Sequence, residues 1–185
     1  MKAFLAGLAI FGVLGAAGTP RTIREVDFKN FSYAIPVTGP TLGHDRLVWL
    51  SPYTVRHVKL VNGKSTTGFS FQSEQFGDVL GNHREEAVVV LRFDTGGVQN
   101  TNYVYIYSFV AERPKLLAYF HTGDRAFSGL YRVYGENGLL VVDLFDPDMR
   151  SGDCCSSGYV RTRYRWLGGR FQPFGPRENG TVEHP

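Results

Sequence analysis

The chain has 185 residues, 43% of them hydrophobic, and a formal net charge of +3. This is enough apolar surface for one ordinary domain. The near-balanced charge lacks the basic stripe of a nucleic-acid-binding surface, so we exclude nucleic acid as a partner. Tyrosine and phenylalanine occur 10 and 14 times and glycine 22 times. Aromatic residues fit strands and glycine fits tight turns, so the composition predicts a β-rich fold.

Residues 1–18 have the pattern of a secretory signal peptide. Lys2 gives a positive start, residues 4–14 form an apolar run, and small residues at 15–18 offer a cleavage site. The run is shorter than the roughly 20 apolar residues that cross a bilayer. We therefore expect an exported protein, periplasmic or extracellular, in an oxidising compartment and with no membrane span after cleavage.

Residues 19–175 are predicted to form a single β-rich domain. Its first part, 19–52, reads as an N-terminal arm with one candidate strand at 27–34, and residues 176–185 are predicted to be a flexible tail. Asparagine–glycine or glycine–glycine pairs mark three tight turns, at 62–63, 137–138 and 168–169. Further strands are expected at 55–60, 69–76, 86–93, 103–110, 115–121, 130–134, 139–145, 159–166 and 170–174.

Two of these strands have patterns that predict burial. The continuous apolar run at 86–93 favours a strand covered on both faces. In the next strand, Tyr103, Tyr105, Tyr107 and Phe109 share one face, with apolar residues opposite. We expect this row to be buried, and the alternative is a platform on which sugars stack.

Short strands joined by tight turns predict an antiparallel all-β meander of about 8–10 strands. The expected architecture is a barrel-like or two-sheet domain. One or two propeller-like blades are the alternative, and the lack of internal repeats excludes a full propeller.

The segment from Gly77 to Val90 reads Gly-Asp-Val-Leu-Gly-Asn-His-Arg-Glu-Glu-Ala-Val-Val-Val. It resembles the loop-plus-strand element of FG-GAP and VCBS-type repeats of exported bacterial proteins, in which an acidic loop wraps a calcium ion. The resemblance implies calcium ligands at Asp78, Asn82 and Glu86. The loop departs from the family pattern at three positions, and calcium takes about six to eight oxygen ligands. The alternative is therefore a loop that keeps its turn without the ion.

Cys154 and Cys155 are the only cysteines, and they are adjacent. Consecutive Cα atoms lie about 3.8 Å apart, below the usual disulfide range of about 4.4–6.8 Å, so a vicinal disulfide would be strained. Such a bond could stiffen a ligand loop or sense redox state. Alternatively, the pair only shapes the loop at 146–158. Two neighbouring thiols without a supporting cysteine or histidine pair lack the ligand spacing of a zinc site.

Arg161, Arg163 and Arg165 alternate with bulky residues on the predicted strand at 159–166. This spacing places three guanidinium groups on one face, where they suit the carboxylates or phosphates of an acidic glycan or cell-surface polymer. The alternative is a solvated outer face crossed by acids of neighbouring strands, such as Asp143.

Taken together, these patterns favour an exported, non-enzymatic β-domain that binds or scaffolds a partner at the cell envelope or outside the cell. The partner would be an envelope polysaccharide or protein, and calcium is the one cofactor considered. No nucleophile elbow, zinc helix or phosphate loop occurs, so no catalytic residue is assigned. The competing hypothesis is an exported hydrolase that uses carboxylates of the loop from Asp146 to Asp153, or Glu85 and Glu86.

Overall fold

The computed structural model describes residues 20–36, 48–49, 55–94, 96, 100–124, 128–151 and 155–183. The predicted signal peptide lies outside these residues. Within them the named strands pair antiparallel, which confirms the predicted all-β class. The helical elements there are single 3-10 turns, and none has the length and apolar character needed to cross a membrane. They are η1 (Ile23–Glu25), η2 (Phe28–Asn30) and η3 (Pro147–Met149).

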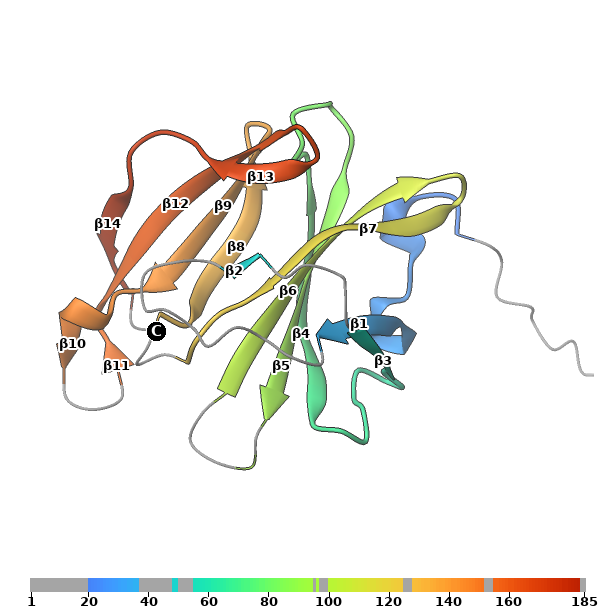
Figure 1. Ribbon diagram of the computed structural model, residues 1–185, viewed down its shortest axis with the longest axis horizontal. Coiled ribbons are helices and arrows are strands. Elements are labelled where there is room, and N and C mark those ends of the chain that lie inside the picture. Colours follow the sequence, from blue (N-terminus) through green and yellow to red (C-terminus); the bar gives the residue numbers. More distant parts are fainter. Residues whose placement is uncertain are drawn as a thin grey trace, which may run out of the picture.

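Two sheets face each other and neither closes into a barrel, so the two-sheet alternative describes the molecule (Figure 1). The central sheet has the order β2 (Val48–Trp49), β7 (Arg113–His121), β6 (Asn100–Val110), β5 (Glu86–Asp94), β4 (Phe69–Gly77). The outer sheet has the order β13 (Arg170–Pro173), β12 (Gly158–Leu167), β9 (Leu139–Phe145), β8 (Leu130–Glu136), and β14 (Glu178–Thr181) also pairs with β12. Two further sheets have two strands each: β1 (Ser32–Pro36) with β3 (Val55–Lys59), and β10 (Arg150–Ser151) with β11 (Cys155–Ser156).

The turn signals in the sequence locate the two hairpins of the outer sheet correctly. Asn137 and Gly138 have φ values of 52° and 75°, and Gly168 and Gly169 have 58° and 81°. Two consecutive positive φ values are the geometry of a type I′ turn, whose twist matches the strands that it joins. A further turn of this kind joins β6 to β7 in the central sheet, where Ala111 and Glu112 have φ values of 50° and 59°.

The strand pairing of the structure corrects other predictions. Asn62 and Gly63 do form a tight turn, but β3 pairs with β1 rather than with β4. The strand predicted at 27–34 begins only at Ser32, because the Asp27 side chain accepts two backbone N–H groups and caps η2. The predicted tail contains β14, which lies on the same edge of β12 as β13.

The central sheet is buried on both faces, as predicted for β5 and for the tyrosine row of β6. Its first face packs against the outer sheet through Val88, Val90, Val104, Ile106 and Phe120, which meet Val133, Leu140, Val142, Tyr164 and Phe171. Its second face packs against the N-terminal segment and β3 through Ala87, Val89, Leu91, Tyr105, Tyr107 and Tyr119, which meet Ile23, Phe28, Tyr33, Ile35, Val58 and Leu60.

Two buried tyrosines fix the N-terminal segment by hydrogen bonds, one to the central sheet and one within the segment itself. The Tyr105 hydroxyl donates to the Ala34 carbonyl at 3.1 Å, and the Tyr33 hydroxyl donates to the Phe28 carbonyl at 2.6 Å. Tyr105 is fully buried, so its ring is part of the core and offers no platform to a sugar.

His121 ends β7 beside Tyr103, and the two ring centroids lie 5.6 Å apart. The residue is 7% exposed, and neither ring nitrogen has a hydrogen-bond partner among the described residues. Burial lowers the pKa of His121, because an apolar site favours the uncharged ring.

We therefore expect His121 to make the fold sensitive to mild acid. Below its ordinary pKa near 6.5, the unfolded state binds a proton that the folded state does not, so stability falls as the pH drops from about 7.5 to about 5. A His121→Phe variant keeps an aromatic ring at this position but has no nitrogen to protonate, so it should lose less stability over this pH range. Urea unfolding at each pH measures the difference, and parallel losses in both proteins would contradict the expectation.

Candidate functional site

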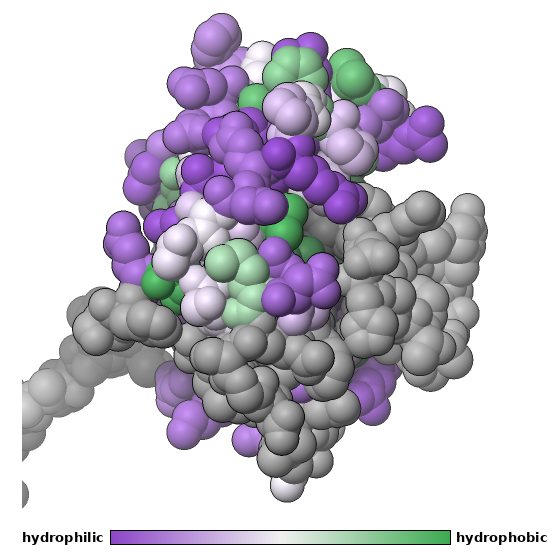
Figure 2. All heavy atoms as spheres, turned by 90° about the vertical axis from the view of Figure 1, so that its left-hand side faces the viewer, coloured by the Kyte–Doolittle hydropathy of each residue, from purple (hydrophilic) through white to green (hydrophobic). Residues whose placement is uncertain are grey.

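The three predicted arginines lie together on the face of the outer sheet that points away from the central sheet. Their neighbour on β12, Tyr164, enters the core between the sheets, so residues one position away point outward. We call this outward surface the arginine face. It comprises Tyr131, Arg132, Tyr134, Glu136, Asp143, Tyr159, Arg161, Arg163, Arg165 and Glu178. Figure 2 looks at the side of the molecule that is on the left in Figure 1, where hydrophilic side chains gather with a few hydrophobic ones between them.

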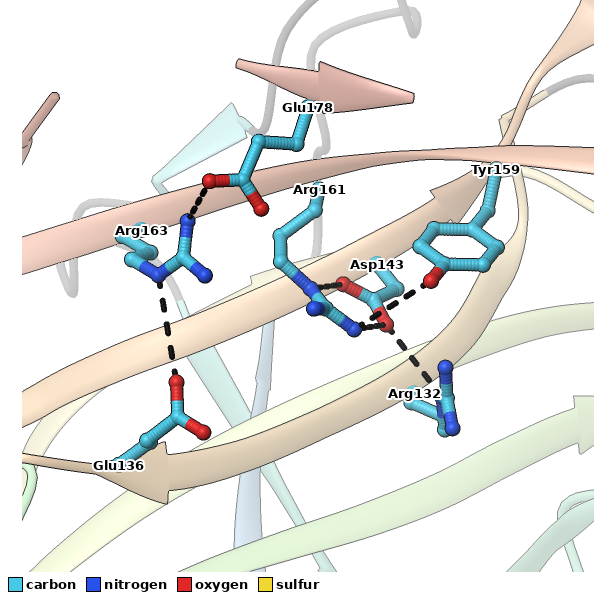
Figure 3. A network of polar contacts seen from close by, with 7 residues as sticks. All are labelled: Arg132, Glu136, Asp143, Tyr159, Arg161, Arg163 and Glu178. Atoms are coloured by element: carbon cyan, nitrogen blue, oxygen red, sulfur yellow. Dashed lines mark hydrogen bonds and ion pairs between the residues drawn. The ribbon is translucent and has the colours of Figure 1, made fainter. Parts of the chain in front are cut away.

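A buried carboxylate lies at the centre of the arginine face (Figure 3). Strand register places Asp143 directly between Arg132 on β8 and Arg161 on β12. Arg161 donates from Nε to Oδ1 at 2.8 Å and from Nη2 to Oδ2 at 2.9 Å, and Arg132 Nε lies 3.3 Å from Oδ2. The Asp143 side chain is fully buried. The hydrogen bond from Arg161 to Asp143, and then the negative charge of Asp143, raise the pKa of Arg161 above its ordinary value.

Arg163 and Arg165 have different partners. The Arg163 guanidinium donates to Glu178 at 2.6 Å and lies 4.0 Å from Glu136, so it links β14 to β8 across β12 and β9 (Figure 3). This hydrogen bond lowers the pKa of Glu178. Arg165 is exposed, and its guanidinium lies 3.6 Å from the centroid of the Phe174 ring. Among the described residues, Arg165 has no carboxylate partner. The cross-strand acids expected from the sequence therefore pair with two of the three arginines.

Aromatic rings lie beside the arginines. The Tyr131 ring centroid is 5.2 Å from that of Tyr159 and 5.3 Å from that of Phe145. The Tyr159 ring lies over Gly180 on β14, where no side chain would fit beneath it. Sequence reasoning missed Tyr131, because its place on this face depends on an irregularity of β8 that no sequence pattern reveals.

The predicted calcium loop is closed by its own carboxylate. Asp78 Oδ1 accepts backbone N–H groups from Leu80, Gly81 and Asn82 at 3.1, 2.6 and 3.1 Å, and Oδ2 accepts that of His83 at 2.8 Å. Partial burial raises the pKa of Asp78, but these four hydrogen bonds together hold it below its ordinary value. The oxygens that the resemblance assigns to an ion thus accept amide hydrogens.

The other two predicted ligands are engaged in the same way. Asn82 Oδ1 accepts the Arg84 N–H at 2.9 Å, and the fully buried Glu86 accepts the Val79 N–H at 3.3 Å. Burial raises the pKa of Glu86. The described residues contain no group of three or more His, Cys, Asp or Glu side chains placed to hold a metal. This arrangement fits a turn without an ion better than a calcium site, and calcium binding stays a prediction.

The remaining candidates are only partly described. The Asp146 side chain accepts the Asp148 N–H at 2.9 Å, while Asp153 and Cys154 lie outside the described residues. The backbone of Cys155 belongs to β11, but its side chain also lies outside the description, so the vicinal disulfide stays a prediction. Glu85 forms an exposed ion pair with Arg24 at 2.6 Å and is not brought together with Asp146 by any described contact.

Comparisons with protein-family models, with curated proteins and with solved structures find no significant match. The arginine face therefore stands as the candidate site on its geometry alone.

Proposed function

We propose that this chain is an exported, non-enzymatic β-sandwich domain that binds an acidic polysaccharide at the cell envelope or outside the cell, through the arginine face. The observation that carries the proposal is a sheet surface on which guanidinium groups lie beside tyrosine rings. Among the described residues it holds four arginines against three carboxylates, a surplus of one positive charge. Guanidinium forks suit carboxylates, and tyrosine rings offer an apolar surface with a polar edge.

The carboxylates of this face hold the arginines in position for a ligand. Asp143 and Glu178 hold Arg161 and Arg163 at fixed points across three strands. A ligand then meets a surface whose side chains lose little rotational freedom on binding. Arg165 and Arg132 remain exposed, with 45% of the Arg132 side chain accessible. These two guanidinium groups are the most exposed to a ligand.

Isothermal titration calorimetry with polygalacturonate, and with dextran as the uncharged polymer, tests the proposal. We expect binding of the acidic polymer alone, weakened by added salt because exposed charges are screened. Arg165→Gln should lower the affinity about threefold or more. Arg113→Gln is the matched control, because Arg113 is an exposed arginine at the start of β7 in the other sheet. Absence of binding, or equal binding of dextran, would contradict the proposal.

An assay for reducing ends on the same samples distinguishes binding of the polymer from its hydrolysis. Release of reducing ends from the polymer, abolished by Asp146→Asn, would replace the binding function by the competing hydrolase. Intact polymer after long incubation, together with salt-sensitive binding, is the result that we expect.

A further inference from the structure

An irregularity in β8 places two neighbouring residues on the same face. The register of β8 against β9 shifts between Leu130 and Arg132, so Tyr131 is an extra residue, a β-bulge. In a regular strand, Tyr131 and Arg132 would point to opposite faces. Here the Arg132 guanidinium lies 4.6 Å from the Tyr131 ring centroid and 5.5 Å from that of Tyr159. Bulges often re-aim side chains beside functional sites.

Arg132 is only partly used by its acidic partner. Asp143 already accepts two hydrogen bonds from Arg161, and Arg132 contributes one contact, through Nε. No hydrogen bond within the described residues involves the two terminal nitrogens of Arg132. One carboxylate thus faces two guanidinium groups, and the one that it holds less fully, that of Arg132, lies over the paired tyrosine rings.

The geometry points to a subsite for a single uronate residue of an acidic polysaccharide, formed by Tyr131, Tyr159 and Arg132. The apolar C–H face of the sugar ring packs on the tyrosine rings, and the sugar carboxylate accepts two parallel hydrogen bonds from the terminal nitrogens of Arg132. This inference rests on the proposed function and names the chemical group that the arginine face recognises. A ring bearing a carboxylate satisfies both parts of the site, whereas a neutral sugar leaves the guanidinium unpaired.

The test is calorimetry with a defined oligogalacturonate and with its methyl ester, which keeps the ring and removes the charge. Wild-type protein should bind the acid about tenfold more tightly than the ester. Arg132→Lys keeps the charge but loses the fork, and Tyr131→Leu keeps apolar bulk but loses the flat ring. Each should weaken binding of the acid about tenfold, while Arg113→Lys should leave it unchanged. Circular dichroism checks the fold of each variant.

The outcomes separate this subsite from the broader proposal. If Arg165→Gln weakens binding but Arg132→Lys and Tyr131→Leu do not, the subsite is wrong and the arginine face still binds the polymer. If the wild-type protein binds acid and ester equally, the subsite is overturned even where a variant fails to fold. If it binds no acidic polysaccharide at all, both proposals fail. Tighter binding of a sulfated than of a carboxylated oligosaccharide would also overturn the uronate assignment.

Discussion

Arg161→Met is expected to lower the free energy of unfolding by about 3 kcal/mol or more, because it leaves the buried Asp143 carboxylate without its bidentate partner. Arg132 remains, but it offers a single contact at 3.3 Å from a half-exposed side chain. Removing one member of a buried ion pair costs more than the pair itself contributes, because the charge left behind is neither hydrated nor paired. Urea unfolding followed by circular dichroism measures the loss.

The double variant Asp143→Leu with Arg161→Met provides the matched comparison. It replaces the pair by apolar side chains of similar size, and such replacements are often neutral or stabilising. We expect the double variant to recover most of the stability that Arg161→Met loses. Arg24→Met, which breaks the exposed ion pair with Glu85, should have little effect. A single variant as stable as the wild type would mean that Asp143 is hydrated or that Arg132 can replace Arg161.

The sequence predicted what local chemistry determines. The Asn137-Gly138 and Gly168-Gly169 turns follow from the need for two positive φ values, and the flanking strands follow from alternation. The apolar run of β5 predicted burial on both faces, and the structure covers it with the outer sheet on one side and the N-terminal segment on the other.

Features that depend on pairing between distant segments could not be predicted. The strand β14 follows a proline and a glycine and carries no apolar pattern, and it forms because β12 offers a free edge. The β-bulge at Tyr131 is likewise set by the register between β8 and β9. Asp143 was recognisable as a cross-strand acid, but its burial between two arginines depends on how three strands align. The row of arginines could therefore be predicted from the sequence, whereas the position of Tyr131 beside it could not.

The loop after β4 joins the two sheets at one corner. A Cβ atom added to Gly138 in the β8–β9 turn would lie 2.8 Å from the Cα atom of Gly81, and one added to Gly135 would lie 3.4 Å from the Asp78 carbonyl oxygen. The backbone of the loop thus packs directly on the hairpin of the outer sheet. Asp78 holds the loop in this shape through its four amide hydrogen bonds.

We therefore expect Asp78→Ala to lower the free energy of unfolding by about 2–4 kcal/mol, since four backbone donors lose a charged acceptor and the loop loosens against the outer sheet. Asp78→Asn keeps one acceptor oxygen and should lose less. Because the pKa of Asp78 is lowered in the fold, its contribution is present at neutral pH and is lost as the pH falls below about 4. Burial and the nearby charge of Asp78 raise the pKa of Glu86, so the difference between wild type and Asp78→Asn reports the two coupled carboxyl groups together.

Melting temperatures with and without calcium distinguish a loop closed by its own amides from a calcium-binding loop. If the amides are the permanent partners of Asp78, millimolar calcium and chelator should leave the melting temperature of the wild-type protein unchanged. A calcium-dependent rise in melting temperature that disappears in Asp78→Asn would show that the ion displaces the amides, as the resemblance to calcium-binding repeats implies. The physical basis is competition for one carboxylate: an oxygen that accepts three N–H groups must release them before it can coordinate a cation.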